Sequence, residues 1–142
     1  MKLPAAAVAA GSFFLLEFGN DQIHSTALAC RGALSSTGVT AAVERTQQAA
    51  TLLAIEEINA AGGVLGRPVE PLVHDPASRP PRYRELAKQL CDEAGVPVIF
   101  GCYMSSTRKA VLPVVEAHRA LLFYPTLYEG FEYSPNCVYT GA

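Results

Sequence analysis

The sequence predicts an α/β protein with a doubly wound parallel sheet, and three observations support this fold class. From about residue 27 to the end of the 142-residue chain, short apolar runs alternate with longer segments of helical periodicity, as in successive strand–helix units. Glycine and proline clusters separate these segments. The run 96–100 is apolar throughout, which is typical of a strand buried on both faces of a parallel sheet.

The first predicted unit is a short strand within residues 27–34, a turn at 35–38 and a long helix. Thr40 is the expected N-cap, although Val43 stands where a capping box needs an acidic residue. Two glycines at 62–63 supply the expected helix end. The side chains that recur at helical spacing, and are therefore expected to face the sheet, are Val43, Ala50, Leu53, Ala54, Ile58 and Ala61.

The second predicted unit is a strand at 69–74 followed by a helix from about 82 to 94. Pro71 suits an edge strand, because it cannot donate a backbone hydrogen bond. Two prolines precede the helix and Gly95 follows it, which are typical start and stop signals. The residues expected to be buried are Leu86 and Leu90, and those expected to face water are Arg82, Arg84, Lys88 and Asp92.

The remaining predicted elements are a strand at 96–100, a helix at about 106–118, a strand at 121–124 and a short strand near Val138. Pro113 lies too far inside the third helix to be a first-turn residue, so a kink is expected there. The strand and helix order implies right-handed crossovers.

Composition narrows the possible functions. The chain is 50% hydrophobic and 17% charged, with a net charge of -2, so it has the composition of a soluble globular protein and no basic stripe for nucleic acid. Its four cysteines lie far apart and form neither a zinc motif nor a dense disulfide framework. We therefore expect reduced or merely unpaired thiols, no metal, no cofactor and no direct nucleic-acid partner.

Residues 1–26 allow two interpretations. Lys2 and the apolar run 3–16 resemble the start of a secretory leader, and the small residues 27–29 before Cys30 resemble a cleavage site. The interval between them is too long and contains acidic residues, and the run is too short to span a bilayer. A leader, an upstream extension and a core segment all remain open, so the sequence is compatible with a cytoplasmic protein or, with a working leader, a periplasmic one.

Polar side chains follow two predicted strands at the edge where an open α/β sheet binds ligands. Gly101 ends one strand, and the next helix begins at Ser105 or Ser106 with backbone N–H groups free to bind an oxygen. Either serine could instead be only the N-cap. The predicted ligand-binding residues are Tyr103, Ser105, Tyr124 and Thr126.

These uncharged groups favour a short amide or urea as the ligand. A ligand carbonyl could accept hydrogen bonds from the helix start and Ser105, and an NH2 group could donate to Thr126 or a tyrosine oxygen. An amino acid normally needs a carboxylate for its ammonium group. The charged residues nearby, which are expected to face solvent, are Arg108, Lys109, Glu129 and Glu132.

The chain resembles the N-terminal lobe of type I periplasmic-binding-like proteins, over about residues 34–142. The segments that carry the resemblance are Ser35–Val39, Gly62–Pro68, His74–Pro76, Gly101–Pro113 and Tyr124–Asn136. Among these proteins it is most similar to short-chain amide and urea receptors. The pairs Tyr103-Met-Ser105 and Tyr124-Pro-Thr126 most resemble the amide-sensing negative regulator of aliphatic amidase expression.

The resemblance implies that the four predicted site residues contact an amide and that residues 27–142 form a partial N-terminal lobe, with the second lobe absent. Leu127 stands where amide sensors usually have proline, which leaves the ligand open. Two non-catalytic functions follow. One is an amide sensor whose partner is an RNA-binding antiterminator, and the other is the substrate-binding component of an ABC importer, with a permease as partner, for amides, urea or branched-chain amino acids.

An enzyme is the third function class. Cys102 or Ser105 could serve as a nucleophile, but a nucleophile needs a base beside it. His118 lies toward the opposite end of the same predicted helix. We therefore expect no catalytic residue and no enzymatic activity.

Overall fold

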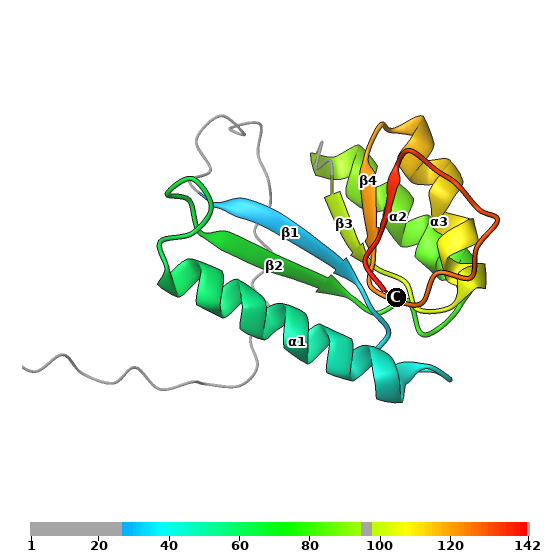
Figure 1. Ribbon diagram of the computed structural model, residues 1–142, viewed down its shortest axis with the longest axis horizontal. Coiled ribbons are helices and arrows are strands. Elements are labelled where there is room, and N and C mark those ends of the chain that lie inside the picture. Colours follow the sequence, from blue (N-terminus) through cyan, green and yellow to red (C-terminus); the bar gives the residue numbers. More distant parts are fainter. Residues whose placement is uncertain (1–26, 95–97, 142) are drawn as a thin grey trace, which may run out of the picture.

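The computed structural model describes residues 27–94 and 98–141, which form a five-stranded parallel sheet with three helices (Figure 1). The elements in chain order are β1 (Leu28–Ala33), α1 (Ala41–Ala60), β2 (Val69–His74), α2 (Pro80–Ala94), β3 (Val98–Gly101), α3 (Ser105–Ala117), β4 (Leu121–Tyr124) and β5 (Cys137–Tyr139). This arrangement confirms the predicted parallel α/β fold. The interpretations of residues 1–26 and the helix end at Gly95 lie outside the described residues.

The strand order is β2-β1-β3-β4-β5, and every neighbouring pair is parallel. The chain moves from β1 to one side for β2 and then to the other side for β3, so the winding reverses between β1 and β3. The β2 strand lies at the edge, where the missing N–H of Pro71 is tolerated. The edge position predicted from Pro71 is therefore confirmed.

The helices cover both faces of the sheet, as the side chains of β1 show. Cys30 and Leu34 line a small space beneath α1 together with Ile55. Arg31 points to the opposite face, because its Nη1 donates a hydrogen bond to the carbonyl of Leu90 in α2 at 3.1 Å. Alternation along β1 thus separates an α1 face from an α2 and α3 face.

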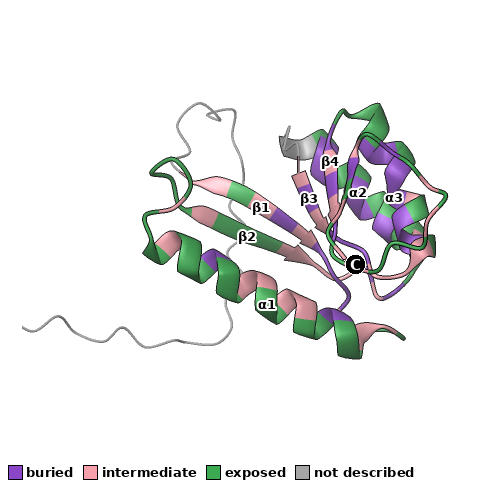
Figure 2. Cartoon of the chain, viewed as in Figure 1, coloured by how far each residue is buried: buried purple, intermediate pink, exposed green. Residues whose placement is uncertain are grey.

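The hydrophobic core lies mainly between β3, β4 and the helices α2 and α3, which pack against each other. Buried residues gather in this half of the molecule in Figure 2. The buried core residues include Tyr83, Leu86, Ala87, Leu90, Ile99, Val111, Val115, Leu122 and Tyr124. The predicted burial of the two leucines of α2 is confirmed.

The face that α1 turns to the sheet differs from the prediction. Val43, Leu53 and Ile58 are 43%, 56% and 40% exposed, and the three alanines predicted to share their face are exposed too. The residues of α1 that are buried are Glu44 and Ile55. The helix is turned this way because the carboxylate of Glu44 lies under it and accepts buried hydrogen bonds.

The ends of α1 lie where the sequence predicts them. Thr40 is the N-cap residue, but its hydroxyl donates to the carboxylate of Glu44 and makes no cap hydrogen bond to the backbone. Gly62 and Gly63 follow the helix with φ of 103° and 77°, the left-handed conformations that glycine adopts at little cost.

The α3 helix begins at Ser105, one of the two predicted start positions. Its N-cap residue is Met104, so Ser105 and Ser106 occupy the first helical turn and neither is the cap. The helix continues through Pro113 as a single element. The hydroxyl groups of the two serines are therefore not used to cap this helix.

Candidate functional site

The carboxyl ends of β1, β3 and β4 meet at one edge of the sheet, on either side of the point where the winding reverses. Gly101 ends β3 there with φ of 149°, and a Cβ at this residue would lie 2.1 Å from the carbonyl oxygen of Ala33 in β1. The backbone of the neighbouring strand therefore fills the space that a side chain at residue 101 would need.

Ser105 is the first residue of α3 and lies at this edge. Its hydroxyl donates a hydrogen bond to the carboxylate of Glu129, in the segment between β4 and β5. The side chain of Glu129 is 61% exposed. Ser106 is exposed. Of the two serines, only Ser105 is thus fixed by a side-chain partner among the described residues.

Tyr103 and Tyr124 are joined directly. Tyr124 is 1% exposed, and its hydroxyl donates to the backbone carbonyl of Tyr103 at 2.8 Å. Burial raises the pKa of the Tyr124 phenol. Tyr103 itself is half-buried. Tyr124 therefore holds the segment after β3 in place, and its hydroxyl is already used within the protein.

Thr126 is half-buried and follows β4 by two residues. Its hydroxyl accepts a hydrogen bond from Nε2 of Gln47, in α1, at 3.3 Å. Gln47 is not among the residues predicted for the site. No pattern in the sequence indicates this residue, because the predicted inward face of α1 was a different one.

The structure thus brings the four predicted residues to the same edge of the sheet. A hydrogen bond joins Tyr124 to Tyr103, and another joins Ser105 to Glu129. The short segment from Tyr124 to Glu129, which contains Thr126, connects the two pairs. No direct hydrogen bond between Ser105 and Thr126 is present among the described residues.

Arg108 is buried, which corrects the expectation that it faces solvent. Its side chain is 1% exposed, its Nε lies 2.6 Å from Oε2 of Glu132, and its guanidinium lies 4.7 Å from the ring centre of Tyr124. Burial alone lowers the pKa of Arg108, but the hydrogen bond and charge of Glu132 outweigh it and raise the pKa. Glu132, also expected in solvent, is 21% exposed because it balances this buried charge.

A second polar cluster joins the end of β1 to α1 and α2. The carboxylate of Glu44, which is fully buried, accepts hydrogen bonds from the backbone N–H of Ser35 at 2.6 Å and from the hydroxyls of Thr40 and Tyr83. The backbone N–H of Ser78 donates to the hydroxyl of Ser35 at 2.8 Å. This cluster fixes the loop after β1 at the same edge of the sheet.

Comparison with known proteins decides the family. Residues 32–142 match the family model described as "Periplasmic binding protein domain", which covers more than half of the chain. The chain belongs to this family. The resemblance noted from the sequence motifs is confirmed at this level.

Several proteins are similar to this binding-protein domain. The leucine-, isoleucine-, valine-, threonine- and alanine-binding protein of Pseudomonas aeruginosa is 32% identical over 90 residues, which are 63% of this chain and 24% of that protein. A putative branched-chain amino acid ABC transporter from Rhodospirillum rubrum is 32% identical, with a TM-score of 0.67, over 70% of this chain and 29% of that one.

The isoleucine-bound branched-chain amino acid transporter substrate-binding protein LivJ of Streptococcus pneumoniae supports the fold. It has a TM-score of 0.70 and 24% identity over 73% of this chain and 30% of that chain. The binding-protein domain spans less than a third of each of these three proteins.

Among the residues considered for catalysis, no hydrogen bond joins Cys102 or Ser105 to His118 in the described parts of the chain. Cys102 is fully buried, and burial raises the pKa of its thiol, which disfavours the reactive thiolate. His118 is the C-cap residue of α3, and its Nε2 lies 2.9 Å from Asp92, at the opposite end of that helix from Ser105. Within 27–94 and 98–141, no group of three or more metal-ligating side chains is found.

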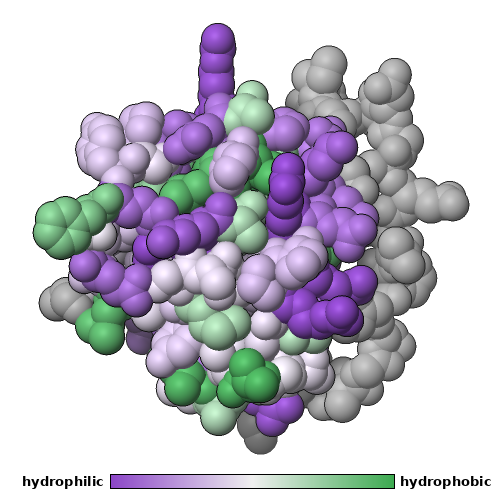
Figure 3. All heavy atoms as spheres, turned by 90° about the vertical axis from the view of Figure 1, so that its right-hand side faces the viewer, coloured by the Kyte–Doolittle hydropathy of each residue, from purple (hydrophilic) through white to green (hydrophobic). Residues whose placement is uncertain are grey.

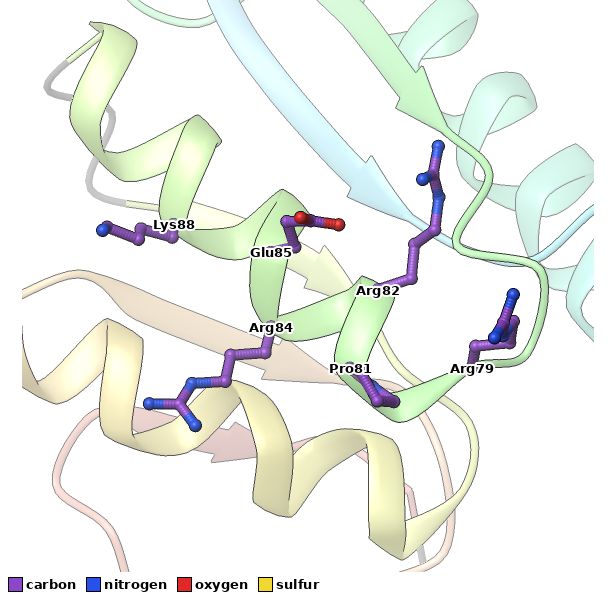
Figure 4. A pocket seen from close by; sticks show the side chains of 6 residues that line it. All are labelled: Arg79, Pro81, Arg82, Arg84, Glu85 and Lys88. Carbon is purple, nitrogen blue, oxygen red and sulfur yellow. The ribbon is translucent and has the colours of Figure 1, made fainter.

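A cavity of about 380 Å³ lies on the outer side of α2. Its lining residues are Arg79, Pro81, Arg82, Arg84, Glu85 and Lys88. Figure 4 shows that the four cationic side chains point in different directions rather than toward one position. The cavity shares no residue with the strand-end site, so we assign the candidate site to the sheet edge.

One face of the binding-protein domain has a mixed surface. Figure 3 shows the face that lies at the right in Figure 1, where hydrophobic residues are scattered among hydrophilic ones. None of the described helices has the length and apolar character that crossing a membrane requires.

Proposed function

We propose that this chain is the N-terminal ligand-binding lobe of the substrate-binding component of an ABC importer, and that its ligand is a small neutral amide such as a short aliphatic amide or urea. The family supports a binding function, and the likeness to transport proteins favours an importer. Under this proposal the protein partner is a permease and the site performs no chemistry.

One observation carries the ligand proposal: two uncharged hydroxyls, of Ser105 and Thr126, lie at the carboxyl edge of the parallel sheet where such folds bind ligands. We assign both hydroxyls to direct contact with the ligand. Tyr103 would contribute its half-buried side chain to the wall of the site. Tyr124 would support the site without contacting the ligand, because its hydroxyl donates a hydrogen bond to the backbone carbonyl of Tyr103 and holds that segment in place.

The amide sensor is the second candidate function. It is favoured by the two motifs Tyr103-Met-Ser105 and Tyr124-Pro-Thr126, which resemble the amide-sensing regulator. An RNA-binding antiterminator would then replace the permease as partner. The importer is preferred because the related proteins reported above are named as binding or transport proteins for amino acids.

A branched-chain amino acid is the alternative ligand. The names of the related proteins suggest it, and Glu129 gives it a specific basis, because a carboxylate beside Ser105 could pair with a ligand ammonium group. That carboxylate also lies 3.8 Å from Nη2 of Arg108, which offsets part of its charge. For this reason the neutral amide is the preferred ligand.

The test is a titration of the isotope-labelled chain with acetamide, urea and leucine, followed by amide chemical shifts in NMR spectra. We expect weak, saturable shifts near Ser105 and Thr126 with acetamide or urea. Ser105→Ala and Thr126→Val should each weaken this binding about 5- to 10-fold, the value of one hydrogen bond. Ser106→Ala is the matched control, because Ser106 is adjacent and exposed.

Two results would contradict the proposal. Preferential binding of leucine would favour the amino acid. Unchanged amide binding in both the Ser105→Ala and Thr126→Val variants would show that the site is elsewhere.

A further inference from the structure

The segment between β4 and β5, residues 125–136, is tied to α3 by side-chain contacts, and we call it the rim segment. The hydroxyl of Ser105 donates a hydrogen bond to the carboxylate of Glu129. One helical turn further along α3, the guanidinium of Arg108 pairs with the carboxylate of Glu132. The residues of each pair are 24 positions apart in the sequence, so the rim segment follows the first turn of α3.

The guanidinium of Arg108 has a fixed position. The side chain is 1% exposed, and its guanidinium carbon lies 4.7 Å from the ring centre of Tyr124 and 5.6 Å from that of Tyr139. These rings belong to β4 and β5. The Nε and Nη2 atoms of Arg108 lie 2.6 and 2.5 Å from Oε2 of Glu132. Glu132 is therefore held at a defined place relative to both α3 and the sheet.

The same guanidinium also lies beside the second carboxylate of the rim segment. Nη2 of Arg108 lies 3.8 Å from Oε2 of Glu129, which is the carboxylate that accepts the hydrogen bond from Ser105. Glu129 stands midway in sequence between Thr126 and Glu132. A displacement of Glu132 would therefore be passed along the backbone to Glu129 and Thr126.

We infer that Arg108 is a positioning residue of the proposed site, because it fixes the rim segment against α3 through Glu132. The relative placement of the hydroxyls of Ser105 and Thr126 then depends on this ion pair. Arg108 is buried and acts without contacting the ligand. The inference rests on the proposed function and extends it to a residue outside the set of ligand contacts.

The stability of the fold does not require a charge at residue 108. Taking a guanidinium out of water costs free energy that its partner repays only in part, so an apolar side chain of similar size is often as stable. Between two tyrosine rings a methionine would pack well, because its sulfur makes favourable contacts with aromatic rings. The ion pair adds direction instead, because the planar guanidinium binds a carboxylate in a defined geometry.

The decisive variant combines Arg108→Met with Glu132→Gln, so that neither charge is left without its partner. We expect its urea midpoint to stay close to that of the unmodified chain. Its affinity for acetamide, measured by the same NMR titration, should fall about 5- to 10-fold, because the rim segment is no longer held against α3. A role in stability alone predicts the opposite result, a lower urea midpoint with unchanged affinity.

The ligand-free spectra of the double variant give a second readout. Amide signals of the rim segment should shift and exchange faster with solvent, because the segment opens more easily. The signals of Ile99 and Leu122, in β3 and β4, should stay where they are, which also shows that the chain is folded.

Two controls are matched to this variant. Lys109→Met with Glu57→Gln makes the same charge changes at exposed positions, and it should bind acetamide as the unmodified chain does. Ile99→Val lowers stability within the core and leaves the rim segment intact. Its unchanged affinity would show that lower stability does not by itself weaken binding.

Arg108→Lys is the second variant, and it tests the inference even if the double variant does not fold. Lysine keeps the positive charge but lacks the planar fork that places Glu132. We expect its affinity for acetamide to fall about 2- to 3-fold.

Two outcomes would overturn the inference and leave the proposed function intact. One is a folded double variant that binds acetamide as tightly as its charge-matched control. The other is a double variant that does not fold together with an Arg108→Lys variant whose affinity equals that of the unmodified chain. If the unmodified chain binds neither acetamide, urea nor leucine, the proposed function itself fails, and the inference fails with it.

Discussion

The two faces of the sheet are packed by different means. On one face, α2 and α3 bury apolar side chains against β3 and β4, including Ile99 and Leu122, which are 1% and 0% exposed. On the other face, α1 turns the carboxylate of Glu44 toward the protein and leaves Leu53 56% exposed. Figure 2 shows the contrast, since α1 carries little buried surface and the α2 and α3 half carries much.

The difference shows how a polar cluster can set the orientation of a helix. An apolar stripe is attracted to any apolar surface, without direction. Two hydrogen bonds to one buried carboxylate, from the backbone of Ser35 and the hydroxyl of Tyr83, act only at defined positions, and they orient α1 about Glu44. The apolar stripe of α1 then faces outward as a result.

The largest expected effect comes from removing a side chain of the apolar face. Leu122→Ala should lower the free energy of unfolding by about 2–5 kcal/mol, because it leaves a cavity at a fully buried position. Leu53→Ala, the same change on the exposed stripe of α1, should cost less than about 0.5 kcal/mol. Urea denaturation measures both, and equal losses would remove the contrast between the faces.

The second effect tests the polar cluster. Glu44→Gln should lower the free energy of unfolding by about 1–3 kcal/mol, because an amide cannot accept all three of the hydrogen bonds that the carboxylate accepts. Glu57→Gln is the control on the same helix, because Glu57 is exposed. A Glu44→Gln variant as stable as its control would mean that the cluster does not orient α1.

The third effect depends on pH. Burial raises the pKa of Asp75, but hydrogen bonds from the backbone of Ala77 and from Thr37 and Ser36 outweigh it and lower the pKa to about 2. Because the folded pKa is below the ordinary 3.8, the stabilisation is complete above about pH 4 and is lost as the pH falls toward 2. Asp75 is partly solvated, so the contribution is about 1 kcal/mol or less.

Asp75→Asn should therefore be less stable than the unmodified chain at pH 6, and the difference should shrink between pH 4 and pH 2. Denaturation series at several pH values measure this. A difference that does not change with pH would mean that the charge of Asp75 does not contribute.

The smallest effect concerns a surface contact on the α2 and α3 face. The backbone carbonyl of Val114 and the side chain of Asp92 raise the pKa of His118 above 6.5. The protonated imidazole therefore adds stability below about pH 6.5, which is lost as the pH rises through the folded pKa. In an NMR titration Asp92→Asn should move the His118 midpoint back toward its ordinary value, and an unchanged midpoint would exclude the ion pair.

Much of the fold follows from the sequence, because strands and helix ends are set locally. Glycines 62–63 and the apolar run that becomes β3 are recognisable without tertiary information. The edge position of Pro71 follows from its missing N–H. The buried face of α1 could not be predicted, because Glu44 finds its partners outside the helix, at Ser35 in the loop after β1 and at Tyr83 in α2.

The candidate site was predictable to a lesser degree. Ser105 and Thr126 could be predicted as site residues because each follows a predicted strand, and parallel strands end at the same edge of a sheet. Gln47 was not identified, and Glu129 was expected only to face solvent, because a glutamine in a helix and a glutamate in a loop carry no local signal of a partner. Arg108 was wrongly predicted to face solvent for a related reason. Its burial depends on the rings of Tyr124 and Tyr139, which lie 16 and 31 residues later in the sequence.

Gly101 has a consequence for sequence variation. A methyl group there would collide with the β1 backbone, and its φ of 149° is one that other residues rarely adopt. Gly32 lies in β1 with open space around the position of a Cβ. A saturation library selected for folding should therefore return many residue types at position 32 and almost none but glycine at 101, which would make the junction of β1 and β3 the least tolerant point of the sheet.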